Sequence, residues 1–122
     1  MSQYYSEIGN DRSDCAVRAT AVAFCMPYNV VADLFFKHGR RKGCGTQRRI
    51  SFNVMREIAP GIEMLSPGER LTIGQFKLRY PKGHYIVFVS QHALAICDGV
   101  VYDWPRFVSK DRRLVKQFWR TV

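Results

Sequence analysis

Residues 13–24 read SDCAVRATAVAF. Small polar residues that can cap a helix stand directly before a cysteine, and alanines and other apolar residues follow it. We therefore expect a buried helix over about residues 13–26, ended by Pro27, with Cys15 in its first turn. The unpaired amides and the positive dipole end of a helix favour an anion, so this position favours the thiolate, which attacks carbonyl groups. The alternative is that Cys15 is only a small core residue.

Composition limits the class of protein. The chain has 122 residues, of which 47% are hydrophobic, and this predicts a single domain over residues 1–122 with one core. No apolar run is long enough to span a bilayer and the N-terminus does not read as a secretion signal, so we expect a soluble cytoplasmic protein. The cysteines at positions 15, 25, 44 and 97 form no CxxC pair and no zinc-type spacing with histidine. We expect no metal site, no disulfide framework and no cofactor.

Positive charge is concentrated in one stretch of the chain. The net charge is +9, and no acidic residue occurs between Asp33 and Glu57. We call residues 37–56 the basic window, and its candidate partner-binding residues are Arg40, Arg41, Lys42, Arg48 and Arg49. Such a surface attracts nucleic acid, an acidic protein face or membrane headgroups. The alternative is a solvated basic loop that serves solubility.

The remaining periodicity predicts helices first and a sheet afterwards. Further helices are expected over about residues 28–38, 47–58 and 72–80, and strands over 62–65, 84–89, 92–97, 100–104 and 114–122. In the closing strand Phe118 and Trp119 fall on opposite faces, of which one is normally buried. The predicted fold class is α+β, with N-terminal helices packed on a C-terminal antiparallel sheet.

The pair Asp98-Gly99 is a strong signal for a two-residue hairpin turn. With these residues in the loop, Cys97 pairs with Val100 and the position of Leu94 pairs with that of Asp103. Alternate residues and cross-strand partners share a face, so His92 and Asp103 become diagonal neighbours. We expect this face to pack against the first helix. A buried carboxylate and imidazole are costly without a role or a partner, although a purely structural His92–Asp103 pair remains an alternative.

These residues supply a nucleophile, a base and an orienting group. Cys15 would attack a carbonyl, His92 would move the proton, and Asp103 would fix the imidazole. The oxyanion would be held by backbone N–H groups at the start of the helix, including that of Cys15, with help from the side chain of Asn10.

The order of these residues resembles a known family. A cysteine at the start of a central helix, a histidine at the start of a strand and an aspartate on the next strand are similar to papain-like cysteine peptidases in their smallest form, such as the peptidase domains of bacteriocin exporters. The amino-acid sequences of several short segments also resemble those of small phage-encoded proteins. These segments are NDRSDCAVRA (10–19), MPY (26–28), HGRRKGCGT (38–46), HALA (92–95) and DGVVYD (98–103).

The resemblance implies a papain-like fold, the triad roles for Cys15, His92 and Asp103, and action in a host cytoplasm. The family carries a glutamine before the nucleophile, where this chain offers Asn10 or backbone alone. Two classes of function follow. One is a cysteine hydrolase or acyl transferase acting on a peptide, isopeptide or amide bond. The other is a non-catalytic scaffold that binds nucleic acid or an acidic host protein through the basic window.

Overall fold

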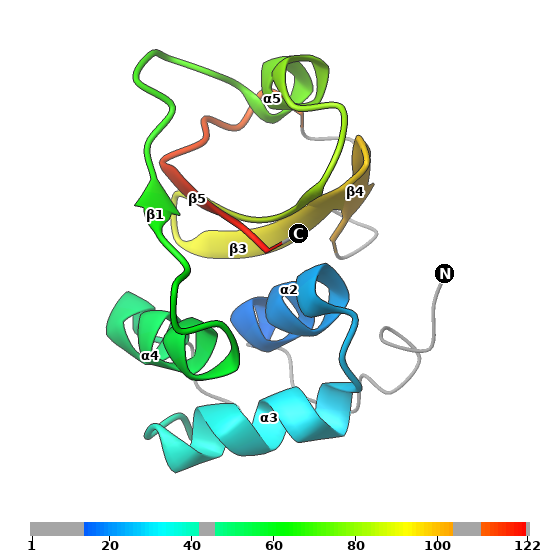
Figure 1. Cartoon of the computed structure of the whole chain (residues 1–122). Helices are drawn as coiled ribbons and strands as arrows, with labels where there is room; N and C mark the ends of the chain where they lie inside the picture. The colour runs from blue at the N-terminus through cyan, green and yellow to red at the C-terminus, as the bar shows by residue number, and fades with distance from the viewer. Residues whose placement is uncertain (1–13, 42–45, 104–110, 122) are drawn as a thin grey trace.

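The computed structural model describes residues 14–41, 46–103 and 111–121 (Figure 1). Helices precede a C-terminal antiparallel sheet, which confirms the predicted α+β class. The helices are α2 (Cys15–Phe24), α3 (Tyr28–Lys37), α4 (Arg48–Ile58) and α5 (Ile73–Arg79). The strands are β1 (Met64–Leu65), β2 (His84–Val89), β3 (His92–Cys97), β4 (Val100–Tyr102) and β5 (Gln117–Arg120).

The sheet has the strand order β1-β5-β2-β3-β4, and its neighbouring strands are antiparallel. The β3–β4 hairpin has the register predicted from its turn, because Cys97 pairs with Val100 and Ala95 pairs with Tyr102. Asp98 and Gly99 have φ angles of 49° and 80°. Both residues of the turn are therefore left-handed, as the tight turns that match the strand twist require.

Helices cover both faces of the sheet. Figure 1 shows α2, α3 and α4 on one side of it and α5 on the other. Trp119 packs with the helices α2–α4, whereas the adjacent Phe118 packs with α5. Both side chains are buried, at 0% and 2% exposure, because neither face of the sheet is open to water at this point.

We expected the face of the hairpin that carries His92, Leu94 and Ile96 to pack against α2, and this prediction is wrong. Leu94 and Ile96 belong to the core beneath α5, and it is Ala93 and Ala95 that face α2. Alternate residues of a strand point to opposite faces, so these two sets separate between the two cores. The small side chains of the alanines allow the α2 backbone to approach the sheet closely, which the larger leucine and isoleucine would prevent.

Helix α2 is the buried centre of the helical layer. Ala16, Val17, Ala21 and Ala23 are all at most 5% exposed. The C-cap of helix α2 is Cys25, which lies two residues before Pro27 and has a left-handed φ of 55°. The N–H group of Cys25 donates to the carbonyl of Val22. Of the helices in the described ranges, none is both long enough and apolar enough to cross a bilayer.

Candidate active site

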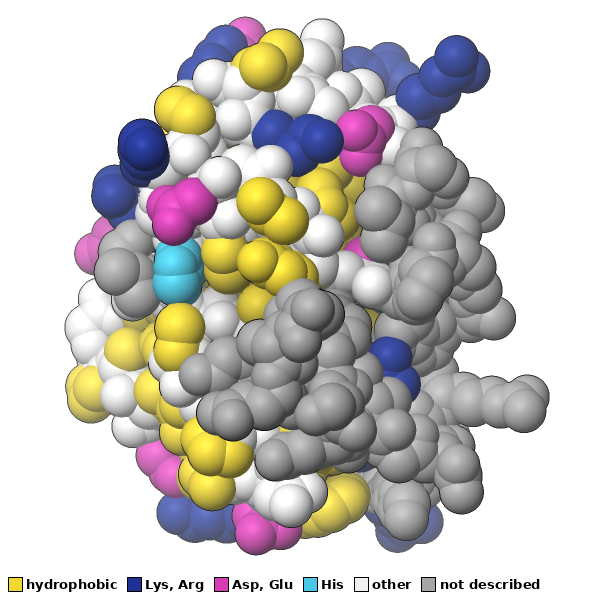
Figure 2. All heavy atoms as spheres, turned by 90° about the vertical axis from the view of Figure 1, so that its right-hand side faces the viewer, with side chains coloured by type: hydrophobic (Ala, Val, Ile, Leu, Met, Phe, Trp, Pro, Cys, Tyr) yellow, Lys and Arg dark blue, Asp and Glu magenta, His cyan; other side chains and the backbone are white. Residues whose placement is uncertain are grey.

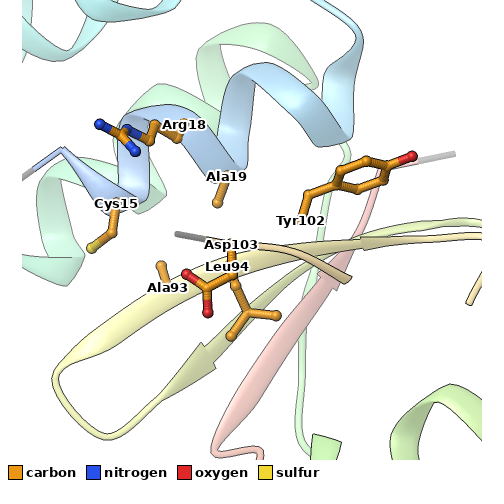
Figure 3. A pocket seen from close by; sticks show the side chains of 7 residues that line it. All are labelled: Cys15, Arg18, Ala19, Ala93, Leu94, Tyr102 and Asp103. Carbon is orange, nitrogen blue, oxygen red and sulfur yellow. The ribbon is translucent and has the colours of Figure 1, made fainter. Parts of the chain in front are cut away.

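Three chain segments meet at one end of the sheet. Strand β3 begins at His92, β4 ends directly before Asp103, and α2 begins beside them at Cys15. Because β3 and β4 are antiparallel, the start of one lies beside the end of the other. Figure 3 shows Cys15 on α2 facing the strand that carries Ala93, with the carboxylate of Asp103 below it. The narrow pocket between them is lined by Cys15, Arg18, Ala19, Ala93, Leu94, Tyr102 and Asp103.

Asp103 holds the imidazole of His92. The Nε2 atom of His92 lies 2.7 Å from Oδ1 of Asp103, and Nη2 of Arg113 donates to Oδ2 at 3.0 Å. The side chain of Asp103 is only 2% exposed, and each of its two oxygens has a partner, one in His92 and the other in Arg113. Arg113 was not predicted, because one arginine in a chain with 19 basic residues carries no local signal of its partner.

The thiol of Cys15 lies close enough to the imidazole of His92 to affect the pKa of the ring. Burial lowers the pKa of His92, but hydrogen bonding and electrostatic interactions with Asp103 and Cys15 outweigh it and raise the pKa to about 9. The ring is therefore cationic at neutral pH. The structure thus brings together the three residues proposed from sequence, and it places them at the end of the hairpin rather than on the face that we expected.

Asp14, which precedes Cys15, is fully buried at 0% exposure. The sequence suggested that small polar residues before Cys15 cap the helix, but the side chain of Asp14 makes no capping hydrogen bond to α2. One oxygen pairs with Nε of Arg18 at 2.7 Å, and the other accepts a hydrogen bond from the hydroxyl of Tyr28 at 2.6 Å. The hydrogen bond between Asp14 and Tyr28 connects the beginning of α2 to α3 and so restrains the position of the neighbouring Cys15.

Cys15 and His92 also face an open groove with a volume of about 450 Å³. Asp103 does not line it, so a substrate would meet the thiol and the imidazole while the carboxylate stays behind them. The other described residues that line it are Ala16, Thr46, Gln47, Arg48, Phe88, Gln91 and Ala93. The amide side chains of Gln47 and Gln91 add hydrogen-bond donors beside the thiol.

A second thiol and imidazole meet at the opposite end of α2. The Sγ atom of Cys25 lies 3.8 Å from Nδ1 of His84, and Nε2 of His84 lies 3.9 Å from Asp98. Nδ1 is also 3.1 Å from the carbonyl oxygen of Ala23. This is the negative end of the helix, which opposes a thiolate, whereas Cys15 stands at the positive end. The sequence analysis did not single out this pair, and Cys25 provides an internal comparison for Cys15.

Two of the remaining predicted residues lie outside the described residues, namely Asn10 and Lys42. Arg40 is only 4% exposed and donates from Nε to the hydroxyl of Thr46 at 3.0 Å, so it does not belong to an exposed basic patch. Its side chain turns inward and contacts Thr46, two residues before α4. Arg41, Arg48 and Arg49 are exposed.

On the side of the molecule that carries β4, the described residues do not form a cluster of basic side chains. Figure 2 shows Lys and Arg side chains there interspersed with Asp and Glu, with hydrophobic side chains between them. In the part of the chain that the structure describes, no group of three His, Cys, Asp or Glu residues could hold a metal ion.

Comparison with known proteins adds no assignment. No family model, curated protein or solved structure matches the chain. The chemistry available at the site is that of a thiol in contact with an imidazolium, which a buried carboxylate holds in place. Groups in this relation can form and release thioesters.

Proposed function

We propose that this protein is a thiol-dependent hydrolase or acyl transferase that acts on a peptide, isopeptide or amide bond. The observation that carries the proposal is the contact of Cys15 with His92, whose ring is held by Asp103 at 2.7 Å. A nucleophile, a proton carrier and an orienting group within hydrogen-bond reach of one another are the requirement for covalent acyl chemistry.

The protonation of His92 decides its first role. Because its pKa is about 9, the ring carries its second proton at neutral pH and can stabilise a thiolate that forms on Cys15. The thiolate attacks the substrate carbonyl and forms a C–S bond, while the backbone N–H groups at the start of α2 stabilise the oxyanion. His92 then donates its proton to the leaving nitrogen, the C–N bond breaks, and a thioester remains on Cys15.

The second half of the reaction determines the class of product. Water or an acceptor amine then attacks the thioester carbonyl and gives a proton to the neutral His92, and the C–S bond breaks to restore the thiolate of Cys15. Attack by water releases an acid, and attack by an amine forms a new amide bond. Asp103 keeps the ring oriented through both halves. Arg113 binds the other oxygen of Asp103 and so restrains the rotation of the carboxylate, which makes it a positioning residue.

A papain-like arrangement accounts for the order of the elements. The nucleophile begins the buried helix α2, the histidine begins a strand of the sheet that packs on it, and the aspartate follows the next strand. This order supports the resemblance to papain-like cysteine peptidases in their smallest form. The resemblance to small phage-encoded proteins further suggests that the protein acts in the cytoplasm of an infected host.

Alkylation by iodoacetamide at neutral pH, followed by peptide mapping, tests the proposal. We expect Cys15 to be labelled faster than Cys25, although Cys25 is the more exposed thiol. The substitution His92→Ala should remove this advantage, whereas His84→Ala, which removes the imidazole beside Cys25, should preserve it. Equal labelling of both cysteines, or no effect of His92→Ala, would contradict the proposed chemistry.

A second candidate function rests on the exposed arginines Arg41 and Arg49. Within the described ranges no carboxylate pairs with either of them, so their charges are available to an acidic protein or to nucleic acid. Retention on a DNA or RNA column should then fall steeply with salt and weaken in the double variant Arg41→Glu, Arg49→Glu. Retention that the double variant leaves unchanged would assign these residues to solvated surface.

A further inference from the structure

The groove beside Cys15 has an unbalanced charge. Of the lining residues that the structure describes, Cys15, His92 and Arg48 are titratable, and none is acidic. His92 is cationic at neutral pH, and its charge pairs with Cys15 and Asp103. Arg48 therefore supplies the positive charge in the groove that remains for a ligand.

Arg48 is held in place by uncharged groups. Its guanidinium carbon lies 5.4 Å from the centre of the Phe88 ring, which also lines the groove. Its Nη1 atom donates to Oε1 of Gln117 at 2.9 Å. In the described part of the chain no carboxylate lies within ion-pair distance of it. Neutral contacts from two strands thus orient the guanidinium without neutralising its charge.

A guanidinium stacked on an aromatic ring keeps further N–H donors for a ligand. Its flat fork matches the two oxygens of a carboxylate, and the ring contact reduces the side-chain entropy lost on binding. The hydrogen bond to Gln117 uses one nitrogen of Arg48 and leaves other donors available. Arg48 and the thiol line the same groove, so a carboxylate at Arg48 and a carbonyl at Cys15 would belong to one molecule.

We infer that the acyl substrate carries a carboxylate close to the scissile carbonyl, and that Arg48 binds this carboxylate in the groove. The inference rests on the proposed function and names its substrate class. Arg48 is the charged groove residue that no described carboxylate neutralises, so the site favours acidic substrates over neutral or basic ones. The carboxylate could belong to an acidic side chain or to the end of a peptide, and both present the same two oxygens.

Three alkylating probes of similar shape test the inference. N-iodoacetyl-glutamine amide is neutral, N-iodoacetyl-glutamate α-amide carries a side-chain carboxylate, and N-iodoacetyl-glutamine carries a terminal carboxylate. We measure the rate at which each probe labels Cys15 by peptide mapping. A charge-assisted contact at an exposed arginine predicts labelling about two- to fivefold faster with at least one anionic probe. The faster of the two identifies the source of the carboxylate.

The variants separate Arg48 from the general positive charge of the protein. Arg48→Gln should reduce the preference for the anionic probe, and Arg48→Glu should reverse it. The matched control is Arg56→Gln, because Arg56 also lies on α4, is exposed, and stacks on an aromatic ring, that of Trp119, but does not line the groove. This control should keep the wild-type preference.

The outcomes distinguish this inference from the proposed function. If the neutral probe labels Cys15 no faster than Cys25 in the wild type, the proposed function fails. If Cys15 is labelled rapidly but the anionic preference is absent, or is the same in Arg48→Gln and Arg56→Gln, only the role of Arg48 is overturned. Loss of the preference in the Arg48 variants alone supports the inference.

Discussion

The substitution Asp103→Asn removes the charge that holds His92 without changing the size of the side chain. The pKa of His92 is raised from 6.5 to about 9, which corresponds to about 3 kcal/mol in favour of the protonated ring. Solvent screening at this partly exposed site reduces the expected contribution to about 2 kcal/mol. Since burial by itself lowers this pKa, the variant should titrate at His92 well below 9.

The pH dependence of stability follows from the direction of this shift. A raised folded-state pKa adds stability that is complete below pH 6.5 and is lost as the pH rises through 9. Between these two values the free energy of unfolding should fall by about 2 kcal/mol more in the wild type than in Asp103→Asn. The variant also loses the ionic partner of Arg113, and that loss does not vary over this range. The slope against pH, rather than the absolute stability, is therefore the relevant quantity.

Two measurements check this prediction. NMR titration of the imidazole C–H resonances gives the pKa of His92 in both proteins, and urea unfolding at several pH values gives the slope. Asp98→Asn is the matched control, because Asp98 lies 3.9 Å from His84 and should leave the titration of His92 unchanged. A wild-type His92 that titrates near its ordinary value, or parallel stability curves for wild type and Asp103→Asn, would refute the reasoning.

Three further substitutions test how the site is supported. Ala95→Leu places extra volume between β3 and α2, where Ala95 is 0% exposed, and should cost about 1–3 kcal/mol in urea unfolding; an unchanged midpoint would mean that the layers do not pack closely. Asp14→Asn breaks the buried contact with Arg18 and should cost about 3 kcal/mol, while an effect below that of Tyr28→Phe would argue against the ion pair. Thr72→Ala removes the capping box of α5 and should cost about 1 kcal/mol in thermal unfolding without slowing thiol alkylation; slower alkylation would show that α5 supports the site.

Local chemistry explains what could be predicted from the sequence. The turn residues Asp98 and Gly99 determine the register of the hairpin, because two successive left-handed residues permit only a tight connection. That register is enough to bring Asp103 beside His92, and the predicted helices and strands also lie where the structure has them, within a few residues. Each of these features depends on neighbours in the chain or across one turn.

The sequence could not show which helices pack against each face of the sheet. Both faces of the sheet are apolar because helices cover both, so alternation separates Leu94 from Ala95 but does not assign either to a helix. The expected placement of the hairpin face against α2 failed for this reason. The distinguishing feature, visible only in the packed structure, is that the small residues face the helix that approaches most closely.

The sequence by itself determined the helix that begins at Cys15 and the hairpin that pairs His92 with Asp103, since helical periodicity and turn chemistry act over a few residues. Only the tertiary structure decided that Cys15 lies beside His92, that Arg113 binds the second oxygen of Asp103, and that Asp14 is buried against Tyr28. The partner of a charged group depends on which distant segments pack beside it. Packing, unlike a turn, is a property of the whole chain.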